Sequence, residues 1–374
     1  MQTVDRAGVD RKRGVTGAGA SPASAVPRVA PAARGARSCA PMPQRILVVR
    51  VGRAGDLVMI TPALRMILDA MPDAEVHLLG SSEAPRVLRG FDPRITRIHL
   101  YHRRFPESLL LPRRTARALA LEGYARAYVF ESNPHYRRLV AGAAPQIHAL
   151  EEGGPETHYA ARCLALVEST LVAAPARRWI HLPVTDAARA AADAALTAAG
   201  LGAGERLVGL HLTYSESGRS PLRDREGRRH RLWPLDAWAA LARGFEELGR
   251  ARGIALRPVV DVLPHERALI EPFVREAGNA VTVLSGPPDF ERYKAVLERL
   301  ALFVTPNTGP MHVAAAVGTR VVALFSGWSP EDSGPFVPPD RVRILRAEDA
   351  GAHRDGLAAL PPAAVLDAGA EMLR

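Results

Sequence analysis

The sequence is poor in cysteine, in aromatic side chains and in long apolar runs. Its two cysteines, Cys39 and Cys163, provide neither a disulfide framework nor a zinc-binding pattern, which favours a reducing cytoplasm. No apolar run approaches the ~18 residues of a membrane-spanning helix. Residues 1–42 also lack the continuous apolar core of a secretory signal. We therefore expect a cytoplasmic chain.

The chain is strongly basic, but the excess charge is unevenly distributed. Of the formal net charge of +10, half falls in residues 1–42, which hold seven Lys and Arg against two Asp. This segment is rich in Ala, Gly, Pro and Ser and has no hydrophobic period, so it cannot bury enough apolar surface to offset its ordering entropy. We expect a disordered basic tail, with Met42 as an alternative start of translation.

The sequence pI of about 10.3 raises nucleic-acid binding as one alternative function. Aromatic residues make up 5% of the chain, and we see neither a stacking platform nor an RNA-recognition motif. Because half of the net charge lies in the tail, we expect no specific nucleic-acid partner. Any such affinity should vanish when residues 1–41 are deleted.

From Arg45 onward, strands alternate with helices. RILVVRV and EVHLLG are continuous apolar runs of strand length, typical of strands buried on both faces. A helix is expected between them, in ALRMILDAM, and after an Ala-rich helix at 185–200 a second series starts at GERLVGLHL. Short βα connections predict parallel sheets with right-handed crossovers. The fold class is therefore α/β, with two doubly wound Rossmann-like domains facing a central cleft.

The predicted divisions of the chain follow from this alternation. They are the tail at 1–42, a first domain at 43–183, an interdomain helix and linker at 184–204, a second domain at 205–358 and a C-terminal helix at 359–374. In open α/β sheets, ligands bind at the carboxyl ends of the strands. Three loops at such positions carry residues suited to chemistry.

The first loop is VGRAGDLV, residues 51–58. Gly52 and Gly55 bracket a tight turn, and Asp56 stands where the next helix should begin. Asp56 is either a helix N-cap, a contribution of ~1 kcal/mol, or a carboxylate at the cleft that accepts a proton from a substrate hydroxyl. A dinucleotide site is disfavoured because G-x-x-G-D lacks the GxGxxG spacing.

The second loop, residues 213–238, is dominated by arginine. Arginine pairs with phosphate oxygens in bidentate fashion, so a mobile basic loop would suit an anionic ligand. Its arginines are Arg219, Arg223, Arg225, Arg228, Arg229 and Arg231. For most of them solvated surface charge is the alternative. Pro234 fits the first position of the following helix, and Asp224 and Glu226 are too closely surrounded by arginine to bind a divalent metal.

The third loop is TPNTGPMH, residues 305–312. It is either a tightly packed strand-to-helix turn or a phosphate cradle. Gly309 removes the Cβ that would keep a ligand from the backbone, and Pro310 is tolerated in the first turn. The free N–H groups and the helix dipole favour an anion there, with the Thr308 hydroxyl as a further donor. His312 points to the same spot or is a satisfied polar residue of the packed interior.

The pairing of ILVVRVGRAGDLVMITPAL near the start with NTGPMHVAAAVGTRVVALF near the end resembles the heptosyltransferases of glycosyltransferase family nine. The resemblance covers roughly residues 45–345 and includes Arg-Leu-Trp-Pro at 231–234. It implies a two-domain GT-B enzyme of lipopolysaccharide core assembly. It also implies inverting, metal-independent transfer from ADP-heptose to a sugar hydroxyl.

The resemblance further implies roles for particular residues. The family's proposed general base corresponds to Asp56, and a basic residue that contacts the donor phosphates corresponds to Arg231. The diphosphate site of the family corresponds to Thr308, Gly309 and His312.

Two further residues belong to the expected donor site, and one position departs from the family. Thr213 joins the phosphate-binding set, and Glu266 matches an acidic residue that holds the ribose. Asn307 stands where the family usually has Asp, so the donor need not be the usual heptose.

We therefore expect a glycosyltransferase whose partners are a nucleotide-sugar donor and a saccharide or lipid-linked saccharide acceptor. No metal or other cofactor is expected. The chain should be a monomer in the cytoplasm, with peripheral contact to the inner face of the membrane if the acceptor is lipid-linked. The alternatives are a nucleotide-sugar epimerase on the same fold, which would act without an acceptor, and a glycosyltransferase of secondary metabolism with another donor.

Overall fold

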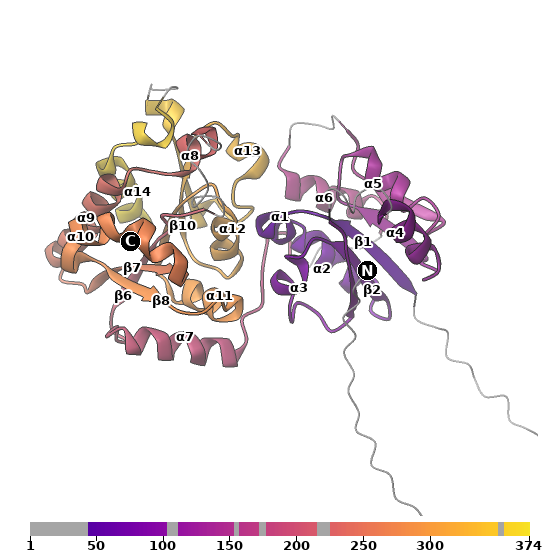
Figure 1. The fold of residues 1–374 in the computed structure, drawn as a ribbon, viewed down its shortest axis with the longest axis horizontal. Helices are drawn as coiled ribbons and strands as arrows, with labels where there is room; N and C mark the ends of the chain where they lie inside the picture. Colours follow the sequence, from indigo (N-terminus) through magenta and orange to yellow (C-terminus); the bar gives the residue numbers. More distant parts are fainter. Residues whose placement is uncertain (1–43, 103–110, 153–156, 172–176, 215–224, 351–354) are drawn as a thin grey trace, which may run out of the picture.

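The computed structural model describes residues 44–102, 111–152, 157–171, 177–214, 225–350 and 355–374. The predicted basic tail and Arg219, Arg223 and Asp224 lie outside the described residues, and no side chain is described for Arg225. The described chain forms two α/β domains, each built around one parallel sheet (Figure 1).

The first sheet has the strand order β3-β2-β1-β4-β5, with every neighbouring pair parallel. Its strands are β1 (Arg45–Arg50), β2 (Glu75–Gly80), β3 (Ile95–Leu100), β4 (Arg126–Val129) and β5 (Gln146–Ala149). The central strand β1 buries Ile46 to Val49 completely, as its apolar sequence predicts.

Helices cover both faces of this sheet. Ile46 and Val48 face one hydrophobic core with α1 (Ala54–Met59), α2 (Thr61–Ala70), α3 (Ala84–Val87) and α6 (Tyr159–Glu168). Leu47 and Val49 point to the opposite face, which is covered by α4 (Leu111–Ala120) and α5 (Pro134–Leu139). Because side chains alternate along a strand, consecutive residues of β1 serve both cores.

The second sheet has the order β11-β10-β9-β6-β7-β8 and is also parallel throughout. Its strands are β6 (Arg206–Leu210), β7 (Leu256–Val262), β8 (Thr282–Ser285), β9 (Leu302–Pro306), β10 (Val321–Phe325) and β11 (Val342–Arg346). Counted within each domain, the orders are 3-2-1-4-5 and 3-2-1-4-5-6, the arrangement of doubly wound Rossmann-like sheets. The predicted fold class is confirmed.

The second sheet is likewise covered on both faces. One face packs against α7 (Asp186–Ala198), α11 (Phe290–Arg299) and α12 (Gly309–Ala316). The other packs against α9 (Leu235–Arg252), α10 (Arg267–Ala277) and the C-terminal helix α14 (Pro362–Met372). Shorter elements are α8 (Arg225–Arg231), α13 (Pro330–Ser333) and 3₁₀ turns at Pro264–Glu266, Gly278–Ala280, Pro339–Arg341, Ala347–Ala350 and Gly356–Ala359.

The structure corrects the prediction of the second loop. The segment expected to be a loop over 213–238 contains the helix α8, with Glu226 in its first turn and basic residues in its last, a distribution that suits the helix dipole. Pro234 is the N-cap of α9, one position before the expected N1. The first loop is also shorter than predicted, since the chain is helical from Ala54.

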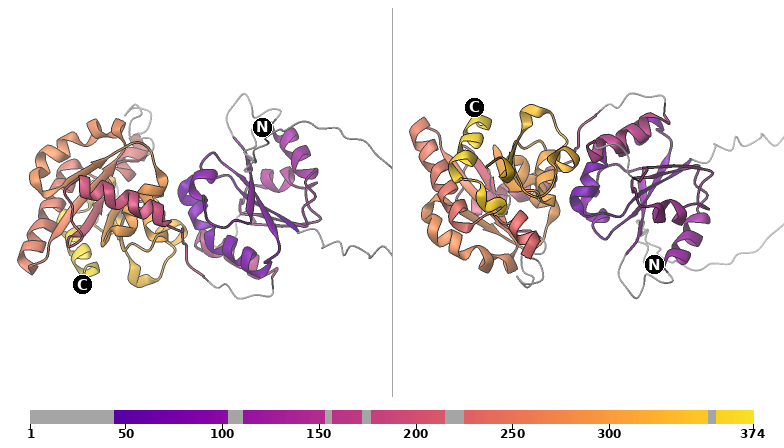
Figure 2. Two further views of the ribbon diagram at one scale, coloured as in Figure 1. Left: turned by 90° about the horizontal axis from the view of Figure 1, so that it is seen from below. Right: turned by 90° about the horizontal axis from the view of Figure 1, so that it is seen from above.

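The segment that joins the two domains in Figure 2 is hydrogen-bonded to both of them. The Ile180 and Leu182 N–H groups donate to the Phe336 and Ala316 carbonyls of the second domain, at 3.1 and 3.0 Å. The His181 N–H donates to the Thr61 hydroxyl of the first domain at 3.1 Å. Within the described ranges, no helix has the length and hydropathy needed to cross a membrane.

Candidate active site

Asp56 lies in the first turn of α1, directly after the end of β1. It is the third helical residue rather than the N-cap, which is Arg53. Its Oδ2 accepts the Arg53 N–H at 2.8 Å, and its Oδ1 forms an ion pair with Arg50 Nη2 at 2.7 Å. About a third of the Asp56 side chain (32%) is exposed. The carboxylate is thus fixed in orientation and still accessible.

Gly52 is required by the close approach of Asp56. A Cβ added at Gly52 would lie 2.4 Å from the Asp56 Cβ and 2.6 Å from its Oδ2. No side chain can occupy that space, so the first glycine of the G-x-x-G-D turn makes room for the carboxylate.

Arg50, at the end of β1, holds the Asp56 carboxylate in place through their ion pair. Its Nη1 forms an ion pair with Glu131 Oε2 at 3.3 Å and donates to the Phe130 carbonyl at 3.2 Å. Its guanidinium stacks 4.4 Å from the Tyr159 ring centroid. Burial alone would lower the pKa of Arg50, but Tyr159, Asp56 and Glu131 outweigh it and raise this pKa. No sequence pattern pointed to Arg50 or Glu131.

The first domain contacts the second where the helices α1 and α12 begin. A Cβ added at Gly55, the residue before Asp56, would lie 2.7 Å from the His312 Cδ2 and 3.4 Å from the Gly309 Cα. A Cβ added at Gly309 would in turn lie 3.6 Å from the Gly55 backbone nitrogen. Glycines on both sides therefore let the two backbones meet. The Asp56 turn and the third loop, distant in sequence, form one site.

His312 is buried in this contact, with 4% of its surface exposed. Burial lowers its pKa to about 4, although the nearby Asp56 carboxylate favours the charged form. The ring is therefore neutral near pH 7. Its Nδ1 is buried and has no hydrogen-bond partner among the described residues, so the expectation of a satisfied polar residue does not fit this nitrogen.

The turn before α12 leaves the helix N-terminus without a side-chain cap. Thr308 is the N-cap residue, yet its hydroxyl does not bond to the helix amides. Instead Thr308 Oγ1 lies 3.3 Å from both the Pro306 carbonyl and Thr305 Oγ1. The adjacent Asn307 N–H donates to the Leu324 carbonyl at 3.0 Å, which ties the turn to β10. Uncapped amides and the helix dipole can attract an anion here.

Arg231 is the last residue of α8. Its guanidinium lies 4.6 Å from the ring centroid of Trp328, which follows β10. The next residues turn inward: Trp233 is buried, and its Nε1–H donates to the Leu360 carbonyl at 3.0 Å. The RLWP motif therefore anchors α8 to the second domain through Trp233 and leaves Arg231 near the carboxyl edge of the sheet.

Thr213 and Glu266 meet beyond the ends of β6 and β7. The buried Thr213 hydroxyl donates to Glu266 Oε1 at 2.8 Å, while Glu266 Oε2 accepts the Leu263 N–H at 3.0 Å. Since β6 is the neighbour of β9 in the sheet, this pair lies on one side of the α12 turn and Trp328 lies on the other.

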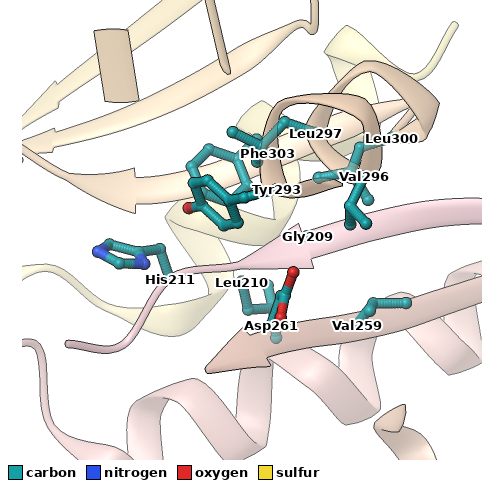
Figure 3. A pocket seen from close by; sticks show the side chains of 10 residues that line it. All are labelled: Gly209, Leu210, His211, Val259, Asp261, Tyr293, Val296, Leu297, Leu300 and Phe303. Atoms are coloured by element: carbon teal, nitrogen blue, oxygen red, sulfur yellow. The ribbon is translucent and has the colours of Figure 1, made fainter. Parts of the chain in front are cut away.

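A small pocket opens against β6 and β7 beneath α11 (Figure 3). Asp261 points into it and pairs with Arg292 at 3.0 Å. Burial raises the pKa of Asp261 despite the attraction of Arg292. Neither residue belongs to a motif that was predicted from the sequence. His211, also at the pocket, is kept neutral because burial lowers its pKa to about 4.

The predicted site residues are thus distributed along one edge of the second sheet, with the Asp56 turn of the first domain against it. Among the described residues, no three His, Cys, Asp or Glu side chains gather as metal ligands would. The three remaining described arginines of the second loop, Arg228, Arg229 and Arg231, belong to α8.

Comparisons with known proteins show a family match for part of the chain and structures of similar fold. Residues 225–357 match the family model of glycosyltransferase family 9 (heptosyltransferase). The family 9 glycosyltransferase from Veillonella parvula DSM 2008 has a similar structure, with a TM-score of 0.72 at 18% identity over 88% of this chain and 97% of that one. No curated protein matches the chain.

Two Escherichia coli structures are also similar. ADP-heptose lipopolysaccharide heptosyltransferase II gives a TM-score of 0.63 at 18% identity, over 88% of this chain and 99% of that one. Heptosyltransferase WaaC with ADP gives 0.62 at 19% identity, over 88% and 100%. At identities of 18–19%, these structural matches show only that the fold is shared. The family match is a match of sequence and covers most of the second domain. Residues 225–357 therefore form a glycosyltransferase family 9 domain, which confirms the resemblance found in the sequence.

Proposed function

We propose that the chain transfers a heptose from ADP-heptose to a hydroxyl of a saccharide acceptor such as lipopolysaccharide core, with inversion and without a metal. The observation that carries this proposal is the contact between the Asp56 turn and the start of α12, where Gly55 meets Gly309 and His312. It brings an accessible carboxylate of one domain to an uncapped helix N-terminus of the other.

The proposed chemistry divides the reacting charges between the two domains. Asp56 accepts the proton of the acceptor hydroxyl as the oxygen attacks the anomeric carbon. The bond to the diphosphate breaks on the opposite face of the sugar, which inverts the anomeric centre. The amides at the start of α12, the Thr308 hydroxyl and Arg231 stabilise the negative charge that develops on the diphosphate. His312 is neutral near pH 7, so it would add hydrogen bonding rather than charge.

The donor is proposed from chemistry and from a related structure. Glu266, already held by Thr213, has the acceptor oxygens needed for ribose hydroxyls. WaaC from E. coli, with a TM-score of 0.61, has been solved with ADP-2-deoxy-2-fluoro heptose. Because Asn307 stands where the family usually has Asp, the alternative is a donor with a different sugar. Such a donor would suit an enzyme of secondary metabolism.

A peripheral membrane contact is proposed for the first domain. Five arginines on α4 and the neighbouring α5 are exposed, and none of them forms an ion pair with a residue that the structure describes. These α4–α5 arginines are Arg113, Arg114, Arg117, Arg137 and Arg138. A cluster of unpaired cations is attracted to anionic lipid headgroups. The enzyme would meet a lipid-linked acceptor as a cytoplasmic monomer on the inner face of the membrane.

The proposed function is tested by incubating the protein with ADP-heptose in the presence and absence of a heptose-free core acceptor. Chromatography with mass spectrometry follows ADP, the donor and the glycosylated acceptor. We expect ADP to accumulate only with acceptor, and the product to carry the inverted linkage. An epimer of the donor formed without acceptor would instead identify an epimerase. Transfer only from a different nucleotide sugar would replace ADP-heptose as the donor.

A further inference from the structure

Trp328 is one of the few large apolar side chains that the described chain exposes, at 36% of its surface. It lies in the turn between β10 and α13, with the Arg231 guanidinium 4.6 Å from its ring centroid. The His230 ring meets the same indole edge-on at 5.5 Å. The last two residues of α8 therefore both contact the indole of Trp328, a residue that no sequence motif had indicated.

The turn that carries Trp328 is held from two sides. The Gly327 N–H donates to Glu348 Oε1 at 2.7 Å, and Gly327 has a φ of +71°. A Cβ at this glycine would lie 2.8 Å from the His230 ring, so no other residue fits without displacing α8. Ser326, the preceding residue, contacts His230 Nδ1 at 2.8 Å.

The hydrogen bonds of His230 fix its tautomer and with it the position of α8. Arg229 Nη2 lies 2.8 Å from His230 Nε2, and a guanidinium can only donate, so Nε2 accepts. The ring proton is then on Nδ1 and is donated to the Ser326 hydroxyl. Burial lowers the pKa of His230, which keeps the ring in this neutral form. The end of α8 is thus tied to the turn after β10.

This turn lies beside the start of α12. In the sheet β10 is the neighbour of β9, with Leu324 paired to Pro306, and the Asn307 N–H donates to the Leu324 carbonyl. Trp328 follows the carboxyl end of β10 as Thr308 follows that of β9. The guanidinium on the indole face is therefore held at the edge where the diphosphate of the donor is proposed to bind.

Arg231 has little else to hold it in place. Its Nε is buried without a hydrogen-bond partner among the described residues. When a long cationic side chain becomes ordered on binding, the lost conformational entropy lowers the affinity for the ligand. A contact that orders the side chain before binding removes this cost. A guanidinium over an indole is attracted by the negative face of the ring, and this attraction leaves its N–H edge free to donate.

We propose that Trp328 is a positioning residue that holds the Arg231 guanidinium on its indole face and so prepares it for the diphosphate of the nucleotide donor. The inference rests on the proposed function, because it needs Arg231 to contact the donor. It goes further by assigning a role to a residue outside the three loops.

The test is a double-mutant cycle measured by calorimetric binding of ADP. Trp328→Leu keeps apolar bulk and removes the π face, whereas Trp328→Phe keeps both. We expect Trp328→Leu to weaken ADP binding about three- to tenfold and Trp328→Phe to retain most of the affinity. In the Arg231→Ala background, Trp328→Leu should have no further effect. Adenosine, which lacks the diphosphate, should bind all variants alike, and this also reports that they are folded.

The outcomes separate this inference from the function on which it rests. If Arg231→Ala weakens ADP binding but Trp328→Leu does not, the donor site stands and the role of Trp328 is refuted. If Trp328→Leu weakens binding equally with and without Arg231, the indole acts on the ligand directly and the positioning role is wrong. If Arg231→Ala leaves ADP affinity unchanged, Arg231 is not at the diphosphate, and both the inference and that part of the proposed function fail.

Discussion

Arg50 ends a strand whose four central residues are apolar, and its guanidinium reaches the carboxylates of Asp56 and Glu131. Asp56 was predicted from its place after a strand and before a helix. Arg50 was not, because an arginine at a strand end reads from sequence as a surface charge. Its partner Glu131 is 81 positions away in the chain and meets it only because β1 and β4 are neighbours in the sheet.

Replacing Arg50 should destabilise the protein as well as disorient Asp56. Arg50→Met removes the ion pair between Arg50 and Glu131, whose side chain is 9% exposed. Removing one partner of such a buried pair costs roughly 3–5 kcal/mol, to be measured by urea unfolding. Arg45→Met is the matched control, because Arg45 is 36% exposed in its pair with Glu75 and should cost roughly 0–1 kcal/mol. Equal losses in both variants would refute the special role of Arg50.

At the scale of elements, β2 and β3 contribute to a buried polar cluster that no sequence pattern predicted. Tyr124 Oη lies 2.9 Å from His77 Nδ1 and 3.0 Å from His99 Nε2. A phenol has one proton, so Tyr124 donates to one histidine and accepts from the other. The cluster ties the segment between α4 and β4 to β2 and β3 within an otherwise apolar face.

Removal of the Tyr124 hydroxyl should leave two buried histidine nitrogens unpaired. We expect Tyr124→Phe to lower the free energy of unfolding by roughly 1–3 kcal/mol for each nitrogen left unsatisfied. Tyr128→Phe removes a single hydroxyl contact, to Thr170 at 2.9 Å, and should cost less. The comparison uses urea unfolding at pH 7.5, and a smaller loss for Tyr124→Phe than for Tyr128→Phe would contradict the cluster.

Acid should destabilise the fold through its neutral histidines. Burial lowers the pKa of His99 and of His312 to about 4, against about 6.5 in an unfolded chain. Between these values the unfolded chain binds protons that the folded chain does not, so stability falls as pH decreases from about 6.5 to about 4. Unfolding free energies measured at intervals from pH 7.5 to 4.5 should show this decline. A flat profile would mean that these rings are accessible to protons in the folded protein.

The sequence predicted most strands because buried parallel strands are continuous apolar runs; β2, expected as EVHLLG, was predicted to the residue. It missed β11, a partly exposed edge strand whose alternating VRILR lacks such a run. It also missed α8, because a segment of repeated arginines has no apolar face from which a helix can be recognised. The position of Trp328 depends on its contacts with His230 and Arg231 of α8. Because α8 was not predicted, this position could not be predicted either.

At the scale of the whole molecule, the two domains meet through backbone at glycines and through the linker. Lys294, fully buried in α11, donates to the Pro183 carbonyl at 2.8 Å. His158 of the first domain donates to the Gly334 carbonyl of the second at 2.8 Å. The two motifs of the sequence predicted that Asp56 and the α12 turn face one cleft. The contact of Gly55 with Gly309 and His312 lies within these motifs, whereas the Lys294 and His158 contacts come from residues outside both.

The α4–α5 arginines predict that membrane binding belongs to the first domain. In a chain starting at Met42, which removes the basic tail, Arg113→Gln with Arg117→Gln should weaken binding to phosphatidylglycerol vesicles roughly 10- to 30-fold, at ~1 kcal/mol per arginine. Arg267→Gln with Arg275→Gln removes two exposed charges from α10 of the second domain and is the matched control. Equal weakening by both pairs in co-sedimentation would assign the effect to net charge alone.

The central claim is that one carboxylate of the first domain takes the proton of the acceptor hydroxyl, which then attacks a donor held by the second domain. The most direct measurement compares acceptor-dependent release of ADP from ADP-heptose by the wild type and by Asp56→Asn, alongside calorimetric ADP binding. Asparagine can still accept the Arg53 N–H but cannot take up a proton. We predict transfer at least ~100-fold slower with unchanged affinity for ADP. Transfer by Asp56→Asn at the wild-type rate would contradict the account.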